Sequence, residues 1–313
     1  MKKQIISIAF ASLMLSAGLD AQIDLSGTWD ARNYSDALGV NPGPGPLPVE
    51  YFGLPLNAGG RERALLFDAS QVSSPDRICD PYSGVYVLMG PQGLKIWNET
   101  EPLTGSTIAW HIGGFGDMPP LTIWMDGRQH PSNNALHTYA GFWTGVWEDD
   151  VLTTYTTHLK ASMVRRNGAP SSDRATMRAH WSRHGDLLTV TGRIEDPINL
   201  DGPYYMTRVF QLTGGTPART VGGPCIITYE GVAAGVVRHF LPGKNPFLEQ
   251  ITKAYNIPVE AVLGGPETMY PEYRKKLKDK YVIPEKCPNF FYRGEDGPPS
   301  CGQVGLYGRA PQN

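Results

Sequence analysis

The residues best suited to acid–base chemistry are histidines and carboxylates in the middle of the chain. His158 and His180 lie in stretches rich in aromatic and β-branched residues, and Glu148 and Asp150 belong to an acidic cluster upstream of both. An imidazole changes protonation near neutral pH, and a neighbouring carboxylate can orient it. These four residues predict proton-transfer chemistry. The alternative is that the histidines face solvent or satisfy a backbone group.

The acidic cluster also has other interpretations. Glu148, Asp149 and Asp150 could bind a hard cation through their oxygens. A turn that faces water is favoured, because the three residues fall where the chain should reverse. No metal site is predicted.

A second group of polar residues lies upstream. Arg128 could hold a carboxylate of a ligand in a bidentate manner, and its alternative is an ion pair with Asp126 beside a turn. His130 precedes Pro131, so its backbone is expected to be extended. Arg128 and His130 are therefore candidate ligand-binding residues.

Aromatic residues are the third group. We expect Trp143, Trp147 and Tyr155 to line a ligand site near its mouth. Six tryptophans of the predicted β region could line such a pocket: Trp97, Trp110, Trp124, Trp143, Trp147 and Trp181. The alternative is that such residues simply form the core.

Strands must position these side chains. From Val151 onward the chain alternates, which is typical of a half-buried strand. One face carries Leu152, Thr154, Thr156 and His158. The other face carries Val151, Thr153, Tyr155, Thr157 and Leu159. On a candidate neighbouring strand, His180 shares a face with Thr176 and Arg178. Two imidazoles could then share one barrel interior.

Further strands follow at short intervals and are joined by turns. They are expected at 25–29, 85–89, 94–98, 107–112, 121–126, 175–182, 187–194, 204–212 and 225–229. Short helices are expected at 61–68, 246–255, 259–263 and 270–280. This order predicts a mainly β protein, an antiparallel barrel with a short helical C-terminal extension.

Composition excludes several classes of protein. The 313 residues carry a net charge of -2, so no broad electrostatic signal favours nucleic acid. Gly 36 and Pro 27 indicate many turns and weigh against a helical bundle. No Gly-x-Ser-x-Gly, His-Glu-x-x-His or Gly-x-x-x-x-Gly-Lys motif occurs, and no cofactor is predicted.

The N-terminus is typical of a secretory signal. Lys2 and Lys3 precede the apolar run 5–15, and cleavage is expected after Ala21 or Ala17. No stretch has the length of about 20 apolar residues that a transmembrane helix needs. We therefore predict export to the periplasm or medium without a transmembrane span. The predicted division is 1–21 signal peptide, 22–243 barrel and 244–313 helical and coil extension.

The four cysteines suit an exported protein with disulfides. Cys287 and Cys301 bracket a Pro/Gly-rich tail and form the natural local pair, which leaves Cys79 with Cys225. Zinc binding is the alternative, but no Cys-x-x-Cys is present.

The run 147–157, Trp-Glu-Asp-Asp-Val-Leu-Thr-Thr-Tyr-Thr-Thr, resembles a known pattern. It is similar to the Trp-Glu-Gly-Asp run, followed by a Leu-rich strand and paired threonines, of exported bacterial proteins with a lipocalin-like (calycin) appearance. The run 125–131 is similar to the Asp-Gly-Arg-x-His-Pro of that family, and 194–197 to its Asp-Pro at a strand end. The resemblance implies a lipocalin-like barrel and export. Because Asp149 stands where the family has glycine, the turn must form without it.

Three functions follow from these observations. The leading one is an exported barrel that binds an apolar, ring-containing small molecule in its interior. The alternative is a cofactor-free enzyme of the isomerase, lyase or hydratase type, with His158 and His180 as acid and base in the same cavity. Arg128 would then hold an anionic group. The third is an interaction module that uses the C-terminal helices.

Overall fold

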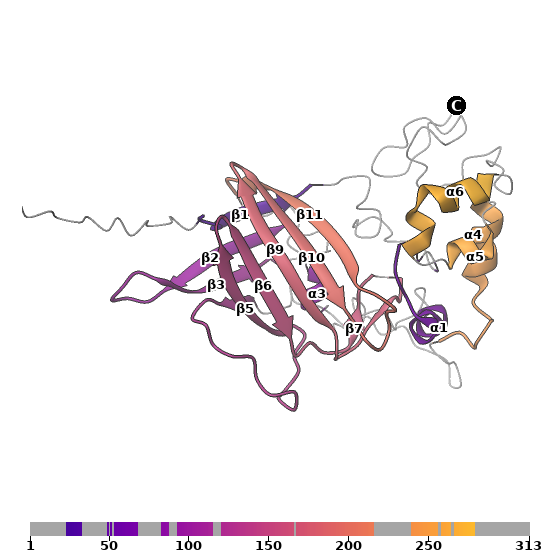
Figure 1. Ribbon diagram of the computed structural model, residues 1–313, viewed down its shortest axis with the longest axis horizontal. Helices are drawn as coiled ribbons and strands as arrows, with labels where there is room; N and C mark the ends of the chain where they lie inside the picture. Colours follow the sequence, from indigo (N-terminus) through magenta and orange to yellow (C-terminus); the bar gives the residue numbers. More distant parts are fainter. Residues whose placement is uncertain are drawn as a thin grey trace, which may run out of the picture.

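A computed structural model of the chain shows a β-barrel with short helices beside it (Figure 1). The structure describes residues 23–32, 49, 51, 53–67, 83–87, 93–114, 120–165, 167–215, 239–255, 258–263 and 266–278. The signal segment 1–21, the strand expected at 225–229 and the four cysteines lie outside the described residues. The signal peptide and the disulfides therefore stay predictions.

Nine strands of the described chain close into one barrel. They are β1 (Gly27–Ala31), β2 (Leu94–Thr100), β3 (Thr107–Gly113), β4 (Leu121–Trp124), β5 (Phe142–Glu148), β6 (Val151–Thr157), β9 (Thr176–His184), β10 (Leu187–Glu195) and β11 (Tyr204–Thr213). Their order is β1-β11-β10-β9-β6-β5-β4-β3-β2, and a separate ribbon joins β7 (Ser162–Met163) to β8 (Pro170–Ser171). The predicted mainly β, closed barrel is confirmed.

One pair of strands departs from the antiparallel prediction. β4 and β5 run in parallel, with Ile123 opposite Trp143. Parallel neighbours need a crossover, because the chain must return to the end of the sheet where the first strand began. Here the crossover is the segment 125–141, which leaves β4 through a left-handed Gly127 (φ 74°) and lies below β5 and β6 in Figure 1. The crossover brings a set of predicted site residues to the outside of the barrel.

Alternation along each strand decides which side chains face the interior. In β6 the buried residues are Leu152, Thr154 and Thr156. In β9 they are Met177, Ala179 and Trp181. Trp29, Trp143 and Trp181 have no exposed surface, so aromatic rings fill much of the interior.

Two tight hairpins form where they were expected. Glu148 pairs with Val151 across the β5–β6 turn, and Asp149 takes the left-handed conformation with φ 51°. Gly185 has φ 57° in the β9–β10 turn, where glycine adopts that conformation without strain. Asp149 therefore takes, at the β5–β6 turn, a backbone conformation that favours glycine.

The strand expected at 85–89 is wrong at 85–87, the part of it that the structure describes. Residues Gly84–Val87 form a single helical turn, α3, in which Val85 and Tyr86 are buried. The nine barrel strands close on themselves and leave no free edge for another β segment. A buried segment beside them must satisfy its backbone groups elsewhere, and Gly84 N donates to Tyr139 O over 2.8 Å.

Helices lie on one side of the barrel (Figure 1). They are α1 (Ala58–Leu66), α4 (Pro246–Tyr255), α5 (Val259–Val262), η2 (Pro266–Met269) and α6 (Pro271–Lys278). α1 begins earlier than expected, because Asn57 Oδ1 accepts a hydrogen bond from Gly60 N and caps the helix. The helices described in the structure are all too short or too polar to cross a bilayer.

Candidate functional site

His130 of the crossover lies against the outer face of β5 and β6. Its Nε2 atom is 2.9 Å from Thr144 Oγ1 on β5, and its Nδ1 atom is 2.6 Å from Thr157 Oγ1 on β6. Its ring contacts Phe142 and Tyr155 at centroid distances of 5.0 and 4.9 Å. These contacts hold the crossover on the barrel wall.

The hydrogen bonds continue from Thr157 to a second histidine. Thr157 Oγ1 is 2.6 Å from Nδ1 of His158, and Nε2 of His158 is 2.9 Å from the backbone oxygen of Ser132. We call Thr144, His130, Thr157, His158 and the Ser132 carbonyl the histidine–threonine chain. It links β5, the crossover and the end of β6.

The Ser132 carbonyl at one end fixes which group donates and which accepts in every hydrogen bond of the histidine–threonine chain. A carbonyl oxygen only accepts, so His158 donates from Nε2. With both rings neutral, Thr157 then donates to Nδ1 of His158 and accepts from Nδ1–H of His130. Nε2 of His130 carries no proton in this arrangement and accepts from the Thr144 hydroxyl. His130 is thereby oriented as a base toward Thr144.

Burial lowers the pKa of His130, and the neighbouring His158 lowers it further. Both effects favour the neutral imidazole that this order of donors requires. A third imidazole, that of His137, lies 5.1 Å from the His158 ring and is 3.0 Å from Leu159 O through Nδ1.

The prediction that His158 faces the barrel interior with Leu152 is wrong. His158 follows the last residue of β6 and has φ 56°, so the alternation of the strand ends before it. Its side chain is buried, with 7% exposed, but its hydrogen bonds are to Thr157 and to Ser132 of the crossover.

His180 lies on the outer face of β9 and is exposed. Its Nδ1 atom is 3.0 Å from Thr153 Oγ1, and Thr153 donates to Glu148 Oε2 over 2.7 Å. Glu148 therefore orients this imidazole through a hydroxyl. Asp150 is exposed at the β5–β6 turn and takes no part in these bonds. His180 faces outward and His158 binds the crossover, so the expectation that the two imidazoles share the barrel interior is wrong.

Arg128 forms the ion pair with Asp126. Its Nε and Nη2 atoms are 2.5 to 3.0 Å from the carboxylate oxygens, and its guanidinium lies 3.4 Å from the centroid of the Trp124 ring. Arg128 lowers the pKa of Asp126 to about 2. The guanidinium is thus already bound on two sides within the protein.

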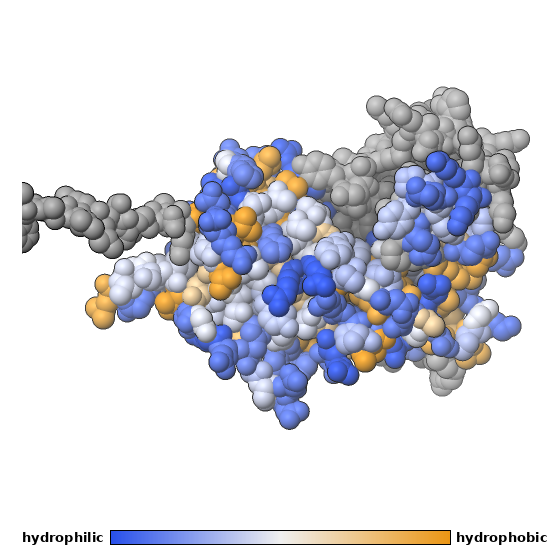
Figure 2. Space-filling model, in the orientation of Figure 1, coloured by the Kyte–Doolittle hydropathy of each residue, from blue (hydrophilic) through white to orange (hydrophobic). Residues whose placement is uncertain are grey.

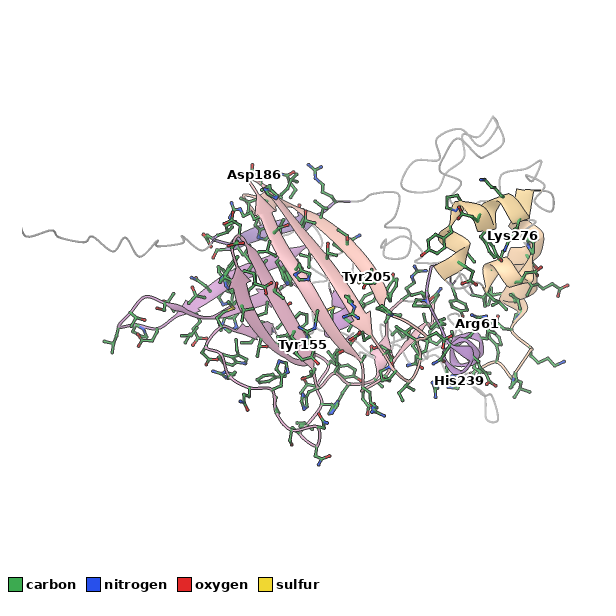
Figure 3. The ribbon with its side chains drawn as sticks, in the orientation of Figure 1. Arg61, Tyr155, Asp186, Tyr205, His239 and Lys276 are labelled. Atoms are coloured by element: carbon green, nitrogen blue, oxygen red, sulfur yellow. The ribbon has the colours of Figure 1, made fainter. Side chains whose placement is uncertain are left out.

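Tyr155 lies on the outer face of the barrel and does not line the interior, contrary to the expectation. It belongs to a row of directly paired residues that crosses four strands: Tyr155, Arg178, Arg193 and Tyr205. We call these four residues the arginine row. Tyr155 and Tyr205 are labelled on this face in Figure 3, and Figure 2 shows strongly hydrophilic residues between them.

The two guanidinium groups of the arginine row differ in their partners. Arg193 pairs with Glu195 at 2.5 Å. Arg178 lies 4.6 Å from the centroid of the Tyr155 ring and, within the described residues, has no acidic partner. Of the two arginines of the arginine row, Arg178 is therefore the one that is open to an anion.

The interior has polar groups of its own. Trp143 is fully buried, and its Nε1 donates to Ala140 O over 2.6 Å, so it belongs to the wall. Trp147 also faces inward, opposite Leu152. In the part of the chain that the structure describes, the buried atoms Trp110 Nε1, Trp147 Nε1 and Thr156 Oγ1 make no hydrogen bond.

Sequence reasoning missed Thr144, Thr157 and Arg178. All three lie at outward positions of alternating strands, where polar residues usually need no explanation. His130 joins Thr144 to Thr157, and its position depends on the parallel crossover, which no local sequence pattern indicates.

Within the described residues, no group of three His, Cys, Asp or Glu side chains could hold a metal ion. The chain matches no family model, no curated protein and no solved structure. Its function therefore rests on the geometry of the site.

Proposed function

We propose that the barrel binds a small, largely apolar molecule in its interior. The observation that carries this proposal is the set of buried atoms Trp110 Nε1, Trp147 Nε1 and Thr156 Oγ1, which have no hydrogen-bond partner among the described residues. A buried polar group without a partner costs about 1–3 kcal/mol. A ligand with hydrogen-bond acceptors in reach of the two indole N–H groups removes part of that cost.

The surrounding side chains favour a molecule with a ring. Trp110 and Trp143 belong to one cross-strand row through Ile123, and Thr156 is opposite Trp143. Trp147 is only partly buried near the end of β5, which gives the interior a less enclosed side. Aromatic walls with a few polar groups are typical of small-molecule sites. An exported, lipocalin-like (calycin) binding protein is the class that this proposal implies.

Two measurements test the proposal. The first is native mass spectrometry of the protein purified from its own cells, where a bound molecule is expected at a fixed mass increment. The second is a titration with ring-containing apolar compounds, followed by tryptophan fluorescence. Trp147→Phe removes one indole donor and should weaken binding about tenfold, the value of one hydrogen bond of roughly 1.4 kcal/mol.

Trp97→Phe is the matched control. Trp97 lies on the outer side of β2, stacks on His111 and is 36% exposed. Its replacement should leave ligand affinity unchanged. A protein of the apo mass that gives no fluorescence change with any compound would contradict interior binding.

A further inference from the structure

We propose a second site on the outer face of β5, β6 and β9, separate from the interior. There the Thr144 hydroxyl is a nucleophile, His130 is its general base, and Arg178 holds the anionic end of a small ester. Thr157 and His158 are positioning residues that act through His130. The site follows from the histidine–threonine chain and the arginine row together.

The hydroxyl and the imidazole already have the geometry of a nucleophile and its base. Thr144 Oγ1 is 2.9 Å from Nε2 of His130, within the reach that proton transfer needs. His130 is oriented in turn by Thr157 through its other nitrogen. A nucleophile, a base and a third group that fixes the base are the parts of a catalytic triad.

The chain beyond His130 selects one tautomer. Ser132 O can only accept, so the bonds through His158 and Thr157 place the His130 proton on Nδ1 and leave Nε2 free to accept. A histidine that only fixed the crossover to the barrel would need one hydrogen bond, and either partner could be the donor. Here four consecutive hydrogen bonds, from Ser132 O to Thr144, point the basic Nε2 of His130 at the Thr144 hydroxyl.

The anion-binding group lies on the same face. Tyr155 is directly opposite Thr144 on one side and Arg178 on the other. Neighbouring strands are about 4.8 Å apart, so the strand of Arg178 is roughly 10 Å from that of Thr144. The guanidinium reaches over the Tyr155 ring at 4.6 Å, and His130 contacts the same ring at 4.9 Å. A short substrate can therefore span Arg178 and Thr144.

The reaction is acyl transfer followed by hydrolysis. Thr144 Oγ forms a bond to the ester carbonyl carbon while its proton moves to Nε2 of His130. The carbon–oxygen bond to the alcohol then breaks, and His130 returns the proton to the departing alkoxide. Water attacks the acyl-threonine with His130 as base, which releases the carboxylic acid and restores the hydroxyl.

Two esters serve as probes: mono-4-nitrophenyl succinate, which is anionic, and 4-nitrophenyl acetate, which is neutral. We expect release of 4-nitrophenol and an acyl adduct that peptide mass spectrometry maps to Thr144. Thr144→Val and His130→Gln should each lower the rate by a factor of about 10²–10⁴, whereas Thr144→Ser should retain activity. Arg178→Met should lower the rate with the succinate ester much more than with the acetate ester.

Thr157→Val tests positioning. It should lower kcat more than it changes KM and should shift the pH–rate profile, because the His130 tautomer is no longer fixed. Circular dichroism establishes that each variant is folded. His180→Gln is the control for general imidazole reactivity, since His180 is an exposed histidine of the same barrel wall.

Three results would each overturn the proposal: a wild-type rate no higher than that of Thr144→Val, an acyl group mapped to another residue, or equal loss in His180→Gln and His130→Gln. None of them depends on the interior site. Trp97→Phe, at a residue that belongs to neither site, should leave ester turnover unchanged.

Discussion

The Oγ1 atom of Thr157 lies 2.6 Å from Nδ1 of His130, which is 27 residues away in the sequence. This bond joins the crossover to β6. The same hydroxyl is 2.6 Å from Nδ1 of His158. A hydroxyl has one hydrogen, so it can donate to only one of the two rings, and the other ring must donate to it. Two protonated rings would leave the hydroxyl without an acceptor.

Thr157→Val should destabilise the protein by about 1–3 kcal/mol, because the buried imidazole of His158 and the half-buried imidazole of His130 lose a partner while the shape of the side chain is kept. Urea unfolding measures the change. Thr189→Val is the matched control, since Thr189 is also a half-buried threonine of a barrel strand but its hydroxyl makes no hydrogen bond with described residues. Equal effects of the two substitutions would show that the Thr157 hydroxyl contributes nothing specific.

Stability should fall in mild acid because of His130. Its folded pKa is lowered from 6.5, chiefly by burial and also by His158, so the unfolded chain binds more protons between the two pKa values. The contribution is fully present above about pH 6.5 and is lost as the pH falls through the folded pKa. His130→Gln should reduce the slope of stability against pH in this window.

The control for that slope is His184→Gln, because His184 is exposed at the end of β9. Its replacement should leave the pH dependence of the free energy of unfolding close to that of the wild type. The idea fails if His130→Gln retains the full wild-type slope from pH 6.5 to 5, measured by urea unfolding at several pH values.

Much of the barrel was predictable because strands and hairpin turns have local signals. The period of two in 151–157 gave β6, and Gly185 marked the β9–β10 turn. The pairing of β4 with β5 has no such signal, since strand direction depends on how the crossover packs. The run at 85–89 has strand-forming residues, yet α3 forms there because the closed barrel offers no edge.

The site was harder to predict than the fold. The expectation for His158 extended the alternation of β6 by one residue, and a positive φ at that residue overturned it. Membership of His130 in a ligand-binding site stays a prediction, and its contacts with Thr144 and Thr157 required the tertiary structure. Arg178 carried no sequence signal beyond its charge.

Trp147 and Trp143 should respond differently to replacement by phenylalanine. Trp147→Phe removes a buried N–H that has no partner among the described residues, so part of the lost packing energy is regained. Trp143→Phe removes an N–H that donates to Ala140 O over 2.6 Å and leaves that carbonyl without the indole donor. We expect Trp143→Phe to be the more destabilising by about 1 kcal/mol or more, measured by urea unfolding of the ligand-free protein. The reverse order would mean that Trp147 has a partner in solution.

Asp149→Gly should stabilise the β5–β6 hairpin. Asp149 has φ 51°, and an L-residue in this conformation is strained by roughly 1–2 kcal/mol, while glycine is not. Glycine costs about 0.5–1 kcal/mol in backbone entropy, so the net gain should be up to about 1.5 kcal/mol. Asp150→Gly is the control next to it: Asp150 has no positive φ and should only lose stability. Urea unfolding of both variants tests this prediction. Equal losses of unfolding free energy in the two variants would show that the Asp149 backbone is relaxed in the folded protein.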